Sequence, residues 1–87
     1  MKYELFESCI FSEYESGSLI LNIETGKYLE LNSVATEIIK GVKEDLTIDE
    51  IINKLDDRYE ESKDEISNQV LSFISTAEKQ KIISKKS

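Results

Sequence analysis

Alternating apolar and polar positions in the first third of the chain predict three short β-strands, because successive side chains of a strand point to opposite faces. The strands are expected over residues 8–14, 19–23 and 27–31. A cluster of turn-forming residues, 15–18, separates the first two. A three-residue connection that ends in Gly26 leads into the third, which is typical of a hairpin that needs a positive φ at its last position. The pattern therefore predicts an antiparallel meander whose third strand lies at an edge.

The third strand is the feature that points to a function. The chain contains no proline, so every residue of this strand keeps its backbone N–H group. An edge strand of this kind presents a row of unpaired backbone groups to which another extended chain can add. We therefore expect the edge formed by residues 27–31 to bind an extended polypeptide.

The remainder of the chain shows helical periodicity with clear start signals. Asn32 can cap a helix over about residues 33–40, which is expected to stop at Gly41. Residues 47–50 (Thr-Ile-Asp-Glu) form a capping box, in which threonine and glutamate satisfy each other's free amides. This box opens a second helix that is expected to end around residue 58.

A second capping-box sequence, residues 62–65 (Ser-Lys-Asp-Glu), opens a third helix. The apolar stripe of this helix consists of Ile66, Val70, Phe73, Ile74 and Ala77. Such stripes must be buried, so the helices should pack on one another and on the sheet. The predicted fold is α+β, with an N-terminal three-stranded antiparallel sheet followed by three helices. We expect one domain over residues 1–83 and a flexible basic tail over residues 84–87.

Composition narrows the class of function. The 87 residues carry a net charge of −7, with a pI near 4.6, which disfavours nucleic acid as a partner. There is no signal-peptide pattern and no apolar run long enough to span a membrane, and the single cysteine, Cys9, suits a reducing cytoplasm. The absence of histidine removes the most common general base and metal ligand. These features favour a cytoplasmic binding protein without a cofactor over an enzyme.

Three segments together carry a family resemblance. They are a strand followed by Leu31-Asn32-x-x-Ala35-x-x-Ile38, then Thr47-x-x-Glu50-Ile51 with a short helix ending in Tyr59, then Val70-Leu71-x-Phe73-Ile74. Over roughly residues 19–83 this pattern resembles the PqqD family, also called RiPP recognition elements after the ribosomally made, post-translationally modified peptides that they serve. Two positions depart from the family: it often has a glycine where residues 43–45 (Lys-Glu-Asp) stand here, and another where Lys81 stands. Both departures concern how helices end.

The resemblance implies a winged helix-turn-helix-like fold that binds peptide rather than DNA. In the family, the leader segment of a precursor peptide adds as a strand beside the third strand, in a groove bounded by the third helix. The domain then delivers the precursor to a modifying enzyme or leader peptidase. Stand-alone members occur in lasso-peptide pathways and with radical enzymes, and the lasso-peptide pathway is the preferred interpretation.

The expected peptide-binding residues lie on these two elements. At 100° per residue, Leu71 sits to one side of the apolar stripe, where it is either a peripheral core residue or a groove wall. Tyr28 and Glu30 face away from Leu29 and Leu31, so they line either a solvated sheet face or a pocket. The complete predicted set is Lys27, Tyr28, Leu29, Glu30 and Leu31 on the strand, with Ser67, Leu71, Ile74 and Glu78 on one flank of the third helix.

Other interpretations stay open at this stage. A winged-helix DNA-binding regulator is the alternative function, although the third helix opens with acidic residues where phosphates would require arginine or lysine. Cys9 lacks a histidine to activate it and is expected to be structural. The acidic pairs 56–57 and 60–61 lack the spacing of a calcium loop and are expected to be solvated, so no metal is predicted. Pairing of the edge strand with a second copy of the chain also remains possible.

Overall fold

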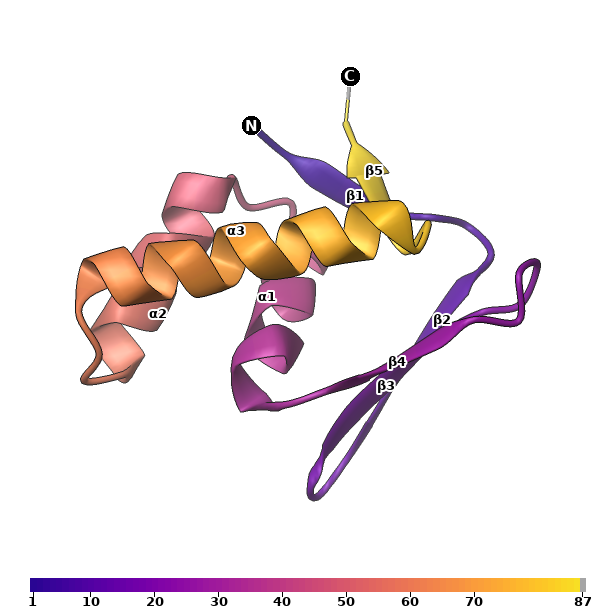
Figure 1. The fold of residues 1–87 in the computed structure, drawn as a ribbon, viewed down its shortest axis with the longest axis horizontal. Helices are drawn as coiled ribbons and strands as arrows, with labels where there is room; N and C mark the ends of the chain where they lie inside the picture. The colour runs from indigo at the N-terminus through magenta and orange to yellow at the C-terminus, as the bar shows by residue number, and fades with distance from the viewer. Residues whose placement is uncertain (87) are drawn as a thin grey trace.

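The computed structural model describes residues 1–86 and contains three helices and two antiparallel sheets (Figure 1). The elements in order are β1 (Tyr3–Leu5), β2 (Cys9–Tyr14), β3 (Gly17–Asn22), β4 (Tyr28–Leu31), α1 (Ser33–Lys43), α2 (Ile48–Arg58), α3 (Lys63–Lys79) and β5 (Ile83–Lys85). The predicted mixture of an N-terminal three-stranded antiparallel sheet and three following helices is confirmed.

The three-stranded sheet has the order β2-β3-β4, so β4 lies at an edge as predicted. Gly26 closes the β3–β4 hairpin with a φ of 73°, the left-handed conformation expected of it. Gly17 opens β3 with a φ of 152°, and a Cβ atom there would lie 2.8 Å from the carbonyl oxygen of Leu31. Both hairpin connections therefore depend on glycine for backbone reasons.

A second sheet, which the sequence analysis missed, pairs the two ends of the chain. Strands β1 and β5 are antiparallel, with Tyr3 opposite Lys85 and Leu5 opposite Ile83. The amide of Lys86 also donates a 3.0 Å hydrogen bond to the carbonyl of Lys2. The prediction of a tail that frays from residue 84 is thus wrong for residues 84–86, while Ser87 lies outside the described residues. Three-residue strands carry too little periodicity to be recognised until their partner is known.

Helix α1 extends past the predicted end. Asn32 caps it as expected, since its side-chain oxygen accepts a 2.9 Å hydrogen bond from the amide of Ala35. Gly41, however, lies inside the helix and is buried. A Cβ atom at that position would lie 2.7 Å from Cγ1 of Ile51, so the glycine permits close packing of α1 on α2 rather than ending α1. The left-handed residue beyond the helix is Asp45, with a φ of 64°.

The two predicted capping boxes differ in outcome. In α2, the Glu50 amide donates to Thr47 Oγ1 at 3.1 Å and the Thr47 amide donates to Glu50 Oε1 at 2.8 Å, so the box is complete. In α3, the Glu65 amide donates to Ser62 Oγ at 3.2 Å, but within residues 1–86 the Glu65 carboxylate makes no return bond. The second box is therefore only half formed, which leaves that carboxylate in solvent.

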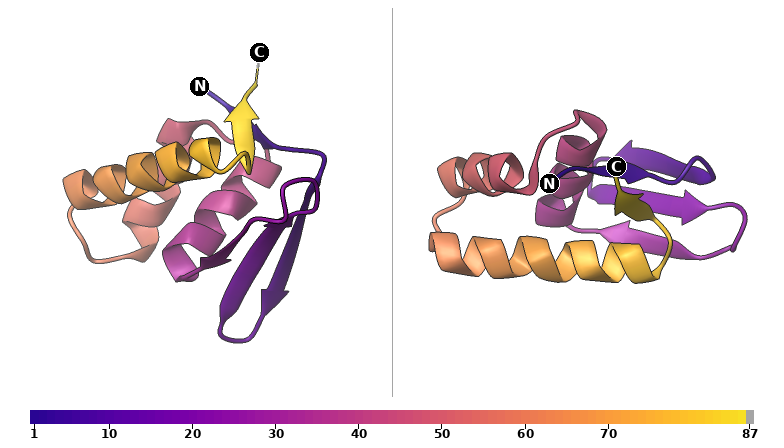
Figure 2. Two further views of the ribbon diagram at one scale, coloured as in Figure 1. Left: turned by 45° about the vertical axis from the view of Figure 1, so that its right-hand side comes forward. Right: turned by 90° about the horizontal axis from the view of Figure 1, so that it is seen from above.

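The helices and the two-stranded sheet lie to one side of the three-stranded sheet (Figures 1 and 2). One core joins them, and buried hydroxyls of Ser18 and Thr36, 2.6 Å apart, link β3 to α1. On the other face of the sheet, Ile10 and Tyr28 are more than half exposed. The buried apolar residues are Tyr3, Ile20, Leu31, Ala35, Ile38, Ile39, Val42, Ile51, Ile52, Leu55, Ile66, Val70, Ile74, Ala77, Ile82 and Ile83.

Candidate functional site: an open strand edge beside an apolar groove

Backbone pairing determines which residues of β4 bond to β3. The amide of Asn22 donates a 2.9 Å hydrogen bond to the carbonyl of Lys27, which continues the register of the β3–β4 pair. In an antiparallel pair, residues that exchange backbone bonds alternate with residues that do not. Leu29 and Leu31 are two and four residues beyond Lys27, so they bond to β3. Their side chains also point toward the helices, and Leu31 is 4% exposed.

Tyr28 and Glu30 alternate with the residues that bond to β3, so their backbone N–H and C=O groups point away from β3. Strand β4 has no second neighbour among residues 1–86. The N–H and C=O groups of these two residues therefore form an unpaired ladder segment of two donors and two acceptors. The predicted free edge is present, and the residues that offer its hydrogen bonds are Tyr28 and Glu30.

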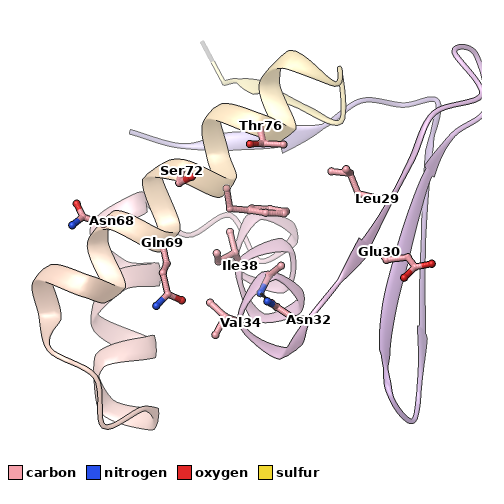
Figure 3. Close-up of a pocket in the computed structure, with 11 residues that line it drawn as sticks. Leu29, Glu30, Asn32, Val34, Ile38, Asn68, Gln69, Ser72 and Thr76 are labelled. Carbon is pink, nitrogen blue, oxygen red and sulfur yellow. Dashed lines mark hydrogen bonds between the residues drawn. The ribbon is translucent and has the colours of Figure 1, made fainter.

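A groove of about 580 Å³ runs beside this edge, between β4 and α3 (Figure 3). Its walls and floor come from three elements: β4 and α1, which are consecutive in the sequence, and α3, which is distant from both. The lining residues are Leu29, Glu30 and Asn32 on and after β4, Val34, Ala35 and Ile38 on α1, and Asn68, Gln69, Ser72, Phe73 and Thr76 on α3. An apolar trough next to unpaired backbone groups suits a chain in extended conformation, with alternate side chains in the trough.

The floor of the groove is the first two turns of α1. The cap formed by Asn32 fixes where the helix starts, directly after β4. Val34 and Ile38 lie one helical turn apart and so face the same side. In Figure 3 they lie between the β4 wall and the α3 wall. The groove therefore depends on the abrupt change from strand to helix at Asn32.

The α3 wall is formed by one flank of the helix, and it is not the predicted flank. Asn68, Ser72 and Thr76 recur every four residues and, with Gln69, present uncharged polar groups to the groove. Phe73 lies at the boundary between this flank and the buried stripe and is half-buried. The wall thus combines one aromatic ring with amides and hydroxyls that can hydrogen-bond to a peptide.

The residues predicted on α3 lie on the opposite flank. Leu71 is 53% exposed there, whereas Ile74 is 3% exposed and belongs to the core. Ser67 and Glu78 are half-buried, and none of these four residues lines the groove. On β4, the structure brings Leu29 and Glu30 to the groove, exposes Lys27 and Tyr28, and buries Leu31.

A signal for the groove-lining flank was present in the sequence. The side of α3 that carries residues 68, 72 and 76 has no charge at those positions, although the chain as a whole is 33% charged. The opposite side was predicted because it carries Leu71, an apolar residue outside the buried stripe. The uncharged polar row beside the half-buried Phe73 is therefore the feature that marks the flank lining the groove.

The other groups considered from the sequence are the Cys9 thiol and possible metal ligands. The Sγ atom of Cys9 lies 3.6 Å from the carbonyl oxygen of Ile82 and 3.8 Å from that of Lys81. Burial raises the pKa of the Cys9 thiol, an effect that a hydrogen bond to the backbone of Phe6 only partly opposes. Residues 1–86 contain no group of three His, Cys, Asp or Glu residues that could hold a metal ion. Over the same range no helix combines the length and the apolar character that crossing a membrane requires.

Comparisons with known proteins place this geometry in context. The family model for "Coenzyme PQQ synthesis protein D (PqqD)" matches residues 17–83. Two solved structures share the fold: TbiB1 in complex with the TbiA(beta) leader peptide, and lasso peptide synthetase B1 complexed with the leader peptide. The first has a TM-score of 0.88 at 14% identity and covers 97% of this chain and 98% of its own. The second has a TM-score of 0.89 at 14% identity, covering 98% of this chain and 100% of its own. No curated protein matches the sequence.

Proposed function

Since this chain belongs to the PqqD family, we propose that it is a non-catalytic binding protein for the leader segment of a ribosomally synthesised precursor peptide. The leader adds as a strand beside β4, with alternate side chains in the groove against α3. The protein then delivers the precursor to a modifying enzyme or leader peptidase. The observation that carries this proposal is the unpaired edge of β4 directly beside an apolar groove.

The free energy of leader binding requires both the open edge of β4 and the groove. Four ladder hydrogen bonds at Tyr28 and Glu30, each contributing about 0.5–1.5 kcal/mol, supply roughly 2–6 kcal/mol. A micromolar complex needs about 8 kcal/mol at the standard state, before the cost of ordering a flexible peptide. Burial of one or two apolar side chains against Leu29 and Phe73, at about 1.5–3 kcal/mol each, supplies the difference. Selectivity therefore resides in the groove, because backbone bonds do not distinguish side chains.

The pathway is supported by the two similar structures. Both are complexes with leader peptides, and one is described as a lasso peptide synthetase component. At 14% identity they establish the shared fold, and their ligands suggest the ligand class proposed for this chain. A lasso-peptide pathway is the preferred assignment, and a radical-enzyme pathway is the second.

DNA binding, which a winged helix-turn-helix-like fold permits, has little support from the surface of α3. Its cations are Lys63 and Lys79, one at each end, and its first turn is acidic. A recognition helix needs several cations to contact phosphates, and the net charge of −7 opposes approach to a duplex. The peptide-binding proposal instead uses the uncharged middle of the helix.

The test is a binding titration with synthetic leaders, the N-terminal segments of short open reading frames found next to this gene. We expect saturable one-to-one binding and loss of affinity in Glu30→Pro, which removes an edge donor without disturbing the bonds to β3. Glu30→Ala is the matched control, because it loses the same side chain but keeps the N–H group. Equal affinity of a folded Glu30→Pro variant and the control would refute strand addition at this edge.

A further inference from the structure

The groove-facing flank of α3 is charged only at its ends. Glu65 lies three and four residues before Asn68 and Gln69, and Lys79 lies three residues after Thr76, so all of them share this flank. Between Glu65 and Lys79 the flank is lined by the uncharged groups of the groove wall. The wall therefore has a negative end and a positive end.

Acidic first turns and basic last turns also occur because they complement the helix dipole. Two further charges, on Glu61 and Lys27, lie outside α3 and reinforce the two charged ends of the groove. The Glu61 carboxylate accepts a hydrogen bond from Nε2 of the groove residue Gln69, which adds a second negative charge at the same end. Glu61 directly precedes the N-cap residue Ser62, and its bond to Gln69 holds its carboxylate against the groove wall.

The positive end is reinforced from the opposite wall. Lys27 directly precedes β4, and its carbonyl accepts the amide of Asn22. The side chain of Asn22 in turn donates to the carbonyl of Lys81, just past the end of α3. Lys27 is thereby placed at the same end of the groove as Lys79. In Figure 3, Leu29 and Thr76 lie at this end, and Gln69 and Val34 lie toward the other.

These four charges are available to a ligand. Glu61, Glu65, Lys27 and Lys79 are all exposed. The ion pairs within residues 1–86 engage other side chains, namely those of Lys2, Glu13, Glu37, Lys40, Glu44, Asp45, Lys54, Arg58 and Lys86. A peptide in the groove would therefore meet the carboxylates of Glu61 and Glu65 at one end and the ammonium groups of Lys27 and Lys79 at the other, none of them in an ion pair within residues 1–86.

We infer that this groove selects a leader by the direction of its charge: cationic residues precede the groove-bound segment and anionic residues follow it. The inference rests on the proposed function. Antiparallel pairing with β4, the arrangement of every pair in these sheets, is also slightly more stable per residue than parallel pairing. A strand antiparallel to β4 enters beside Val34 and leaves beside Lys27. Its N-terminal flank therefore meets Glu61 and Glu65, and its C-terminal flank meets Lys27 and Lys79.

The test uses two isomeric peptides built on the central segment of the synthetic leader. One carries Lys-Lys before the segment and Glu-Glu after it, and the other carries the reverse. The two have identical composition and net charge, so the overall charge of the protein favours neither. We expect the first isomer to bind roughly threefold to tenfold more tightly at about 50 mM salt, and the preference to fade toward about 1 M salt.

A charge-exchanged protein provides the decisive comparison. In Lys27→Glu/Glu61→Lys/Glu65→Lys/Lys79→Glu, which has the same net charge, the preference should reverse. The control Asp57→Lys/Lys85→Glu exchanges exposed charges that do not line the groove and should keep the original preference. Equal binding of the two isomers to the native chain, or preference for the reversed isomer, would overturn the inference and leave the proposed function standing. Failure of the folded chain to bind either isomer or the leader itself would overturn both.

Discussion

The buried side-chain amide of Asn22 donates a 2.8 Å hydrogen bond to the carbonyl oxygen of Lys81, and so connects the β3–β4 hairpin to the turn that follows α3. The side-chain oxygen of Asn22 also accepts from the amides of Glu24 and Thr25 at 3.0 and 3.4 Å. One residue thus holds both walls of the groove at its Lys27 end.

Replacing this residue should weaken the fold and the site together. In Asn22→Ala, three hydrogen bonds are lost, among them the shorter of the two side-chain bonds to the Lys81 carbonyl, so we expect a loss of about 1–3 kcal/mol of stability. Urea unfolding followed by circular dichroism would measure it. Asn68→Ala, at an exposed position of α3, is the control and should change stability by less than about 0.5 kcal/mol. Equal stability of the two variants would contradict the role given to Asn22.

Proline substitutions at neighbouring positions of β4 should have different effects. Leu29 directs its N–H group to β3, so Leu29→Pro should destabilise the protein itself, by about 3 kcal/mol or more. Glu30→Pro should leave most of the stability and remove most of the peptide affinity, because the N–H group of Glu30 faces the open edge. Thermal unfolding and leader titration of both variants would separate the effects. The reverse result would mean that Glu30, and not Leu29, directs its N–H group to β3.

The two flanks of α3 can be distinguished by alanine substitution. Phe73→Ala removes an aromatic wall of the groove and should weaken leader binding by about tenfold or more, as expected for burial of a large apolar group. Leu71→Ala removes an exposed leucine from the opposite flank and should leave affinity unchanged. Isothermal titration calorimetry on variants shown to be folded would check this. Loss of binding in Leu71→Ala alone would restore the flank predicted from the sequence.

A glycine after α3 should stabilise the protein. Lys81 has a φ of 59°, a left-handed conformation that costs a residue with a side chain about 1–2 kcal/mol. Lys81→Gly relieves this cost and keeps the carbonyl that binds Asn22, so we expect a gain of roughly 0.5–1 kcal/mol after the greater chain entropy of glycine is subtracted. The change should appear as a higher unfolding midpoint in urea. Lys85→Gly, in an extended strand, should instead lower the midpoint.

The acid dependence of stability should report on the ion pairs that join the chain ends. Hydrogen bonds from Lys86, and then from Lys2, hold the pKa of Asp45 below its ordinary value of 3.8. A lowered pKa gives stability that is present above the unfolded-state value and lost as the pH falls through the folded-state value. The difference in unfolding midpoint between the native chain and Asp45→Asn should therefore shrink from about pH 6 to about pH 3. A difference that stays constant over this range would exclude the carboxylate as its cause.

Local chemistry made much of this molecule predictable. The caps at Asn32 and Thr47 are formed by residues three positions apart, so the sequence contains both partners of each bond. The alternation in β2–β4 reflects burial of one sheet face, which is equally visible along the chain. The two departures from the PqqD pattern, at residues 43–45 and at Lys81, include Asp45 and Lys81, the two residues other than glycine with positive φ among those described. Glycine suits such positions because it adopts a positive φ without steric cost.

The sequence by itself determined the three helices, the three-stranded sheet with its open edge and the family resemblance, because each depends on neighbours or on a short period. Only the tertiary structure decided which flank of α3 faces β4, since a buried stripe has two flanks and the packing on α1 selects one. It also decided that Gly41 admits Ile51 and that β5 pairs with β1. Those relationships join residues far apart in the chain, so no local pattern of polarity or propensity specifies them.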